Sequence, residues 1–328
     1  NVEIAWFPFD HRRSVCGFLE RANPRCLILV ETELWPNVLY YAHRLDIPVF
    51  IVNGRISAKH NERYERAQRF FAPLLNPITL ACMQTATDAD RIGQLGVQQE
   101  RMVLTGNIKF DGAKTEIDED RRRELRVALG LDPGQQVIVF GSTRPGDEAI
   151  ALTCWTLLAD RFPDSFLVIA PRHSKRIQEA MEPFENEDVL LRSRMSAGEQ
   201  TVGNERVLFV DTMGELGLFY SLATVAVVGG SFSEQVQGHN PIEPAAMGIP
   251  TVFGPHMKNF QAPADILVEA RGAVQVDESG ALASVLLDLL NSEQRLEELG
   301  TNGRAAVLSN RGAIAKTIEH ITPFIDLV

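Results

Sequence analysis

The chain has 328 residues, more than the roughly 250 to 300 at which a single hydrophobic core usually stops growing, so two domains are expected. Its composition, 45% hydrophobic and 23% charged residues, is typical of a soluble globular protein and excludes long disordered segments. The net charge of −11 argues against a nucleic-acid partner, because duplex binding normally needs a basic face.

Taken in chain order, short apolar runs alternate with longer stretches of helical period, which is typical of parallel βαβ construction. We expect strands at residues 2–6, 26–30, 48–52, 78–83, 136–140, 166–170, 207–210 and 225–228. We expect helices at residues 37–44, 88–95, 148–161 and 281–299. Because the later runs are apolar throughout, both faces of each sheet should be covered.

The charged stretch at residues 114–126 separates two groups of strands and predicts the domain junction. Residues 1–113 would then be the remainder of one Rossmann-like domain, and residues 114–328 would be a second. The first domain opens inside a strand without the usual glycine turn, so we expect an amino-terminal portion to be missing. No run approaches the ~18 to 20 apolar residues that span a bilayer, so the chain as given should be soluble.

The four cysteines are far apart and form no CxxC pair, so we interpret Cys16, Cys26, Cys82 and Cys154 as reduced packing residues. No spacing of histidine, cysteine or carboxylate residues suggests a metal site. Basic residues at spacings of three to four, from Arg55 to Arg69, indicate either a solvated helix face or a local site for an anionic acceptor.

The segments "VVGGSF" and "GHNPIEPAAMGIPTVFGP" carry the clearest chemical signal. A strand runs into Gly229, Gly230 and Ser231, where backbone amides could approach a phosphate. Asn240 then predicts a helix start whose dipole favours an anion. Glu243 would either close a capping box or accept hydrogen bonds from ribose hydroxyls, and we favour the ribose.

Two further clusters follow strands of the same predicted sheet, at the edge where open α/β sheets bind ligands. "GSTRPGDE" offers the hydroxyls of Ser142 and Thr143, or is only a capped strand-to-helix connection. "APRH" contains Arg172, which could clamp a phosphate or carboxylate, or lie free at a strand end.

In the first half, "ETELWPN" places Glu31 after a strand, where a carboxylate could orient or deprotonate an acceptor hydroxyl, or cap a helix. "TGNIKFD" places Lys109 where the first domain finishes, facing either solvent or the cleft.

With these motifs in order, the chain resembles the bacterial Kdo transferases of lipopolysaccharide assembly. The resemblance extends from Phe7 to at least Phe260 and rests on "FPFD", "ETELWPN", "NGRIS", "TGNIKFD", "GSTRPGDE", "APRH", "DTMGELGLFY", "VVGGSF" and "GHNPIEPAAMGIPTVFGPHMKNF". It implies an inverting glycosyltransferase of the GT-B fold that moves 3-deoxy-D-manno-octulosonic acid (Kdo) from CMP-Kdo to a lipid A precursor without a metal or other cofactor. It further implies work at the cytoplasmic face of the inner membrane, on whose surface an amino-terminal segment would anchor the protein.

The resemblance puts Glu31 on the acceptor side in a supporting role. Around CMP-Kdo it puts Lys109, Ser142, Thr143, Arg172, Gly229, Gly230, Ser231, Asn240 and Glu243. The family's H-x-x-S-x-G-E segment, which supplies the principal base, is absent here, so this chain alone could bind donor without transferring it. The loop "SFSEQVQGHN" also departs from the family, because Gln237 stands where relatives carry a second glycine beside Gly238.

Two alternatives remain open at this stage. A differently specific GT-B nucleotide-sugar-binding protein, such as a UDP-sugar epimerase, would use a similar glycine turn and glutamate. A non-catalytic nucleotide-binding protein would explain the absent base.

Overall fold

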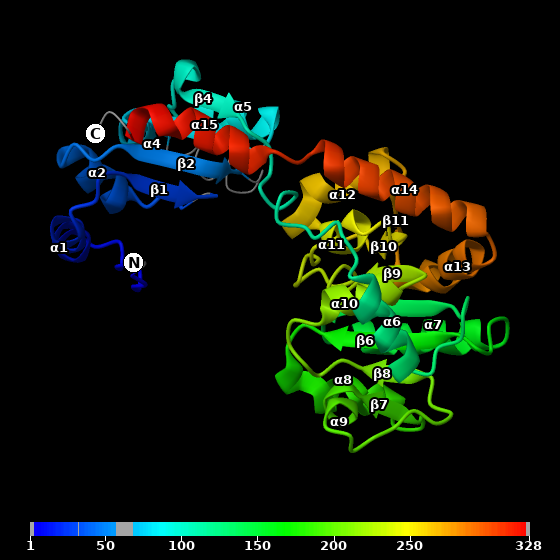
Figure 1. Ribbon diagram of the computed structural model, residues 1–328. Coiled ribbons are helices and arrows are strands. Elements are labelled where there is room, and N and C mark those ends of the chain that lie inside the picture. Colours follow the sequence, from blue (N-terminus) through cyan, green and yellow to red (C-terminus); the bar gives the residue numbers. More distant parts are fainter. Residues whose placement is uncertain (1–2, 32, 57–67, 326–328) are drawn as a thin grey trace. The chain divides into compact units, whose positions relative to one another are not determined.

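The predicted alternation of strands and helices is present in the computed structural model, which describes residues 3–31, 33–56 and 68–325. The described residues divide into two units (Figure 1). Unit 1 runs to Gly112 and resumes at Asn310, and unit 2 comprises Ala113–Ser309. The first boundary falls beside the predicted junction, whereas the second was not expected.

Unit 1 is built, within its described residues, on a four-stranded parallel sheet whose strands follow one another in chain order. The strands are β1 (Leu27–Val30), β2 (Val49–Gly54), β3 (Leu80–Met83) and β4 (Met102–Leu104). Its helices are α1 (Arg12–Ala22), α2 (Pro36–Arg44), α4 (Gln68–Leu75), α5 (Ala86–Gln94), the 3-10 turn η1 (Gln99–Arg101) and, at the end of the chain, α15 (Ala313–Ile325). One face of the sheet packs on α2, α4 and α5 through a core that includes Leu39, Leu75 and Ile92.

The opposite face of this sheet is covered by α15, drawn in red in Figure 1. Ile321 of α15 packs with Phe50, Leu80 and Cys82, and the ring of Phe324 lies 6.0 Å from that of Phe50. Without the helix these apolar side chains would face water. The assignment of residues 114–328 to a single domain is therefore wrong for residues 310–325, which complete the core of unit 1.

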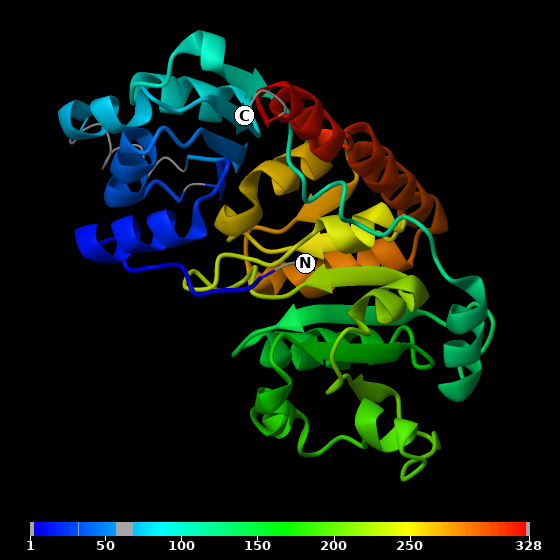
Figure 2. The same ribbon diagram turned by 60° about the vertical axis from the view of Figure 1, so that its left-hand side comes forward.

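Unit 2 contains a seven-stranded sheet of parallel neighbours in the order β11-β10-β9-β5-β6-β8-β7, seen side by side in Figure 2. The strands are β5 (Val137–Thr143), β6 (Phe166–Pro171), β7 (Val189–Leu191), β8 (Val207–Phe209), β9 (Val225–Val228), β10 (Thr251–Phe253) and β11 (Ala273–Gln275). The chain starts in the middle at β5, moves outward to β7, returns to β9 beside β5, and moves outward again. This makes the gap between β5 and β9 the topological switch point of the sheet.

Helices cover both faces of the second sheet, as its continuous apolar strands predicted. α7 (Asp147–Ala159) and α13 (Ser279–Leu290) pack on one face, and α6 (Glu119–Ala128) and α10 (Leu216–Leu222) on the other. The remaining helical segments are η2 (Ser174–Arg176), α8 (Ile177–Met181), η3 (Glu182–Phe184), α9 (Arg192–Ser196), α11 (Ile242–Ala246), η4 (Lys258–Phe260), α12 (Gln261–Glu269) and α14 (Glu293–Ser309).

Some predicted elements differ from the structure. Residues 3–6 form no strand, and Trp6 among them is 98% exposed. The helix expected at 281–299 is two helices, α13 and α14, because the chain leaves the helical path at Asn291, whose side-chain amide donates to the carbonyl of Leu287. Strands β4, β7, β10 and β11, of three residues each, were not predicted. The basic stretch from Arg55 to Arg69 lies mostly outside the described residues.

Candidate functional site

The three residue clusters predicted in unit 2 meet at the switch point of its sheet. Ser142 and Thr143 end β5, Arg172 directly follows β6, and the glycine turn directly follows β9. Since β5 pairs in parallel with both β6 and β9, these ends lie at the same edge. Open α/β sheets bind ligands at this place.

The ends of β5 and β9 approach each other more closely than side chains would permit. The amide of Gly229 donates to the carbonyl of Gly141 over 2.8 Å. A Cβ on Gly229 would lie 2.5 Å from the carbonyl oxygen of Ser142, which itself adopts a left-handed backbone with φ of 58°. Glycine at position 229 is therefore required by backbone contact between the two strand ends.

A buried carboxylate joins the two turns. Asp147, the first residue of α7, is 3% exposed, and its Oδ2 accepts from the amide of Gly230 over 2.6 Å and from that of Arg144 over 2.9 Å. Burial raises the pKa of Asp147 to about 6, against the effect of these two hydrogen bonds. The expectation that the amides of Gly229 and Gly230 face a phosphate is corrected, because both donate to acceptors within the protein.

Ser231 also has internal partners. Its side chain is fully buried, donates to the carbonyl of Val228 over 2.6 Å and accepts from the amide of Gly254 over 2.8 Å. In this conformation the hydroxyl ties the end of β9 to the end of β10 and is not exposed to a ligand.

A second buried acid follows Asp147. Glu148 is 2% exposed, accepts from the hydroxyl of Thr143 over 2.8 Å and lies 3.5 Å from the guanidinium of Arg176. Asp147 and Glu148 thus fix the turn after β5 through their hydrogen bonds.

Asn240 and Glu243 hold each other beside the glycine turn. The Asn240 amide group donates to Oε1 of Glu243 over 3.0 Å, and its Oδ1 accepts from the amide of Ile242, where α11 begins. The helix starts one residue later than predicted, after Pro241. Glu243 is held by a side chain and is half-buried, so a carboxylate oriented in this way can still accept hydrogen bonds from a ligand.

Four basic side chains lie near one another at the same edge: His239, Arg144, Arg172 and His173. The pKa of His239 falls to about 4, chiefly because of burial and then through the positive charges of Arg144, Arg172 and His173. Arg144 and His239 were missed as site residues, although "GSTRPGDE" and "GHNP" contain them. Arg144 did carry a signal in the sequence, a basic residue directly after the end of a strand, whereas His239 lies eleven residues beyond the end of β9 and carried none.

In unit 1, the predicted Glu31 and Lys109 form an ion pair of 3.0 Å between Oε1 and Nζ. Glu31 follows β1 in a left-handed backbone conformation with φ of 63°. Beside them the buried Asn53, at the end of β2, accepts from the amide of Ile108 over 3.1 Å and fixes the loop that carries Lys109. Lys109 was grouped with donor residues, but the structure brings it to the acceptor-side Glu31.

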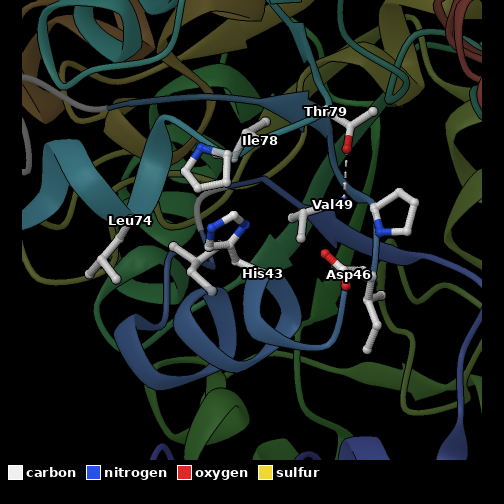
Figure 3. A pocket seen from close by; sticks show the side chains of 10 residues that line it. His43, Asp46, Val49, Leu74, Ile78 and Thr79 are labelled. Atoms are coloured by element: carbon white, nitrogen blue, oxygen red, sulfur yellow. Dashed lines mark hydrogen bonds between the residues drawn. The ribbon is translucent and has the colours of Figure 1, made fainter.

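Two cavities lie away from these residues. One of about 220 Å³, lined by His43, Asp46 and Val49 among others, opens at the amino-terminal ends of β2 and β3 (Figure 3). The other, of about 390 Å³, lies at the amino-terminal ends of β5 and β6. Both are at the edge opposite to that where parallel sheets bind their ligands.

Within residues 3–31, 33–56 and 68–325, no cluster of three or more histidine, cysteine or acidic residues is arranged to hold a metal ion. In the same part of the chain, no helix is long and apolar enough to cross a membrane.

Comparison with known proteins gives consistent matches over both units. Residues 1–112 match the family model described as 3-deoxy-D-manno-octulosonic-acid transferase (kdotransferase). The 3-deoxy-D-manno-octulosonic acid transferase of Haemophilus influenzae is 32% identical over 98% of this chain and 74% of that protein. The enzyme of the same description from Bordetella pertussis is 32% identical over 97% of this chain and 74% of its own length.

Solved structures resemble the same regions. The C-terminal CMP-Kdo binding domain of WaaA from Acinetobacter baumannii matches 57% of this chain and 96% of that domain, with a TM-score of 0.53 and 27% identity. The Staphylococcus aureus MnaA-UDP structure matches 96% of this chain and 80% of that protein with a TM-score of 0.63 but 14% identity, which shows a shared fold alone. The predicted α/β fold of GT-B type is thereby confirmed.

Proposed function

Because this chain belongs to the Kdo transferase family, we propose that it transfers Kdo from CMP-Kdo to a lipid A precursor in lipopolysaccharide biosynthesis. Kdo transferases are glycosyltransferases, so the chain is one of these enzymes. The observation that carries the proposal is the sequence similarity, over nearly the whole chain, to the 3-deoxy-D-manno-octulosonic acid transferases of Haemophilus influenzae and Bordetella pertussis.

On the donor side, we assign CMP-Kdo to the switch point of the unit 2 sheet. Arg172 and Arg144 supply positive charge for the phosphate and carboxylate of the donor. Glu243, oriented by Asn240, accepts from the ribose hydroxyls. The turn of Gly229, Gly230 and Ser231 contributes by placing the His239 ring at this edge, because only glycine at position 230 leaves space for that ring.

On the acceptor side, Glu31 is proposed to orient the hydroxyl that attacks the sugar, and Lys109 to hold the Glu31 carboxylate. The pair is partly exposed, with 42% and 35% of the two side chains accessible. Its contribution to stability is therefore small, which is consistent with a functional role.

We propose that the reaction inverts the configuration of the sugar and uses no metal or other cofactor. The lipid A acceptor implies work at a membrane surface, and we propose the cytoplasmic face of the inner membrane.

The experiment is calorimetric titration of the protein with CMP and with UMP, followed by an assay of Kdo transfer to a lipid A precursor by the full-length protein. CMP should bind more tightly than UMP, and transfer should depend on CMP-Kdo. A preference for UMP would instead support the UDP-sugar alternative, which shares only the fold. Asp188→Asn, at an exposed position of unit 2, is a control that should bind CMP like the unchanged protein.

A further inference from the structure

Two buried nitrogen atoms at the switch point of the unit 2 sheet lack a hydrogen-bond partner. They are Nε2 of His239 and Nε of Arg144, and neither finds an acceptor or donor among the residues that the structure describes. Buried polar groups normally have partners, because a buried donor or acceptor without one loses its hydrogen bonds to water and gains none in return. Two such atoms at one site indicate a group that is supplied by a ligand.

The imidazole of His239 lies directly against the glycine turn. A Cβ on Gly230 would be 3.0 Å from Cδ2 and 3.3 Å from Nε2 of the ring. Glycine at position 230 thus makes room for the ring at the carboxyl end of β9, where the donor phosphate is expected.

The charges around the ring are mostly positive. Arg144 from the turn after β5, and Arg172 and His173 after β6, all oppose a proton on His239. In the part of the chain that the structure describes, neither arginine forms an ion pair with a carboxylate. The nearby carboxylate of Asp147 is held by the amides of Gly230 and Arg144. The cluster therefore carries positive charge that an anionic ligand would balance.

We propose that His239 is neutral in the free protein and takes up one proton when a phosphate dianion binds beside Gly230 and Arg144. The inference rests on the proposed function, which supplies the phosphate. During transfer, the acceptor oxygen forms a bond with the anomeric carbon and its proton passes to solvent, while the bond between that carbon and the phosphate oxygen breaks and its electron pair stays on the phosphate. The diester monoanion becomes a monoester that is a dianion at pH 8, and a proton from solvent on His239 offsets the added charge.

The test uses calorimetry with CMP at pH 6, 7 and 8 in buffers of different ionisation enthalpy, which gives the protons taken up per ligand bound. On binding CMP, His239→Gln should take up fewer protons than the unchanged protein, and the difference should be at most one proton per ligand. At pH 6 the variant should bind CMP about 10- to 100-fold more weakly than the unchanged protein, because it loses a charge-assisted hydrogen bond. At pH 8 the difference in affinity between the two proteins should be smaller. Cytidine, which lacks the phosphate, should show no difference. His320→Gln, at an exposed position of α15, is the matched control and should behave like the unchanged protein.

A direct measurement on the unchanged protein covers the case in which the variant does not fold. The NMR signal of the His239 ring should titrate at a higher pH with CMP than without it. An unmoved titration, or equal proton uptake in His239→Gln, would overturn the proposal. If CMP does not bind while inorganic phosphate binds with His239-dependent proton uptake, the proposed function fails and the anion site stands.

Discussion

Asp147→Asn should make the protein more stable above pH 6 while leaving both turns connected. Asp147 is 3% exposed, and burial raises its pKa from 3.8 to about 6. The folded state therefore holds the proton more tightly than the unfolded state. The stability that results is fully present below pH 3.8 and is lost as the pH rises through about 6. Asparagine carries no charge, and its side-chain oxygen can still accept from the amides of Gly230 and Arg144.

The difference between the folded and unfolded pKa values of Asp147 changes the free energy of unfolding by about 3 kcal/mol in total, at 1.36 kcal/mol for each pH unit. About 2 kcal/mol of this falls between pH 4.5 and pH 8. The advantage of Asp147→Asn over the unchanged protein in free energy of unfolding should grow by that amount across the interval.

Urea unfolding of both proteins at pH 4.5, 6 and 8 measures this difference. Asp188→Asn, at an exposed position, is the control and should change little with pH. An advantage of Asp147→Asn that stays constant from pH 4.5 to pH 8 would refute the burial argument.

Three further predictions concern the turns and the acceptor side. Gly230→Ala should lower the free energy of unfolding by about 2 kcal/mol or more, because φ at this position is 68° and the new Cβ would lie 2.5 Å from Val236. Gly146→Ala, where φ is 98° and the space around the new Cβ is open, should lower it by only about 1 kcal/mol in the same melting experiment. Gln237→Gly should raise stability by about 1 kcal/mol, since Gln237 has φ of 64°, and an unchanged melting temperature would contradict this. In the full-length protein, Glu31→Gln should change stability by less than about 1 kcal/mol but lower turnover by roughly two to four powers of ten, and near-normal turnover would remove Glu31 from the site.

The sequence located most of the elements that matter for the site. Continuous apolar runs such as that of β9 are long enough to identify a strand covered on both faces, and the glycines that follow it identify a tight turn. The placement of Ser142, Arg172 and Gly229 at one edge followed from the parallel arrangement of strands alone. These features depend on local pattern, which the sequence carries directly.

Tertiary structure decided what the polar groups at that edge do. The amides of Gly229 and Gly230, expected to face a phosphate, have acceptors in Gly141 and Asp147, one of them 83 residues away in the chain. His239 could not be identified from spacing, because its buried ring matters only beside arginines from other strands.

The same distinction holds for the domains. The sequence alone determined that there are two α/β units and where the first boundary lies, because hydrophobic period and charge are local properties. Only the tertiary structure decided that α15 belongs to unit 1, since Phe50 and Leu80 leave an apolar face that a helix more than 200 residues later covers through Ile321. Any apolar helix of suitable shape could cover an exposed apolar face. The sequence shows that the helix exists, but only contact between distant segments determines which sheet it covers.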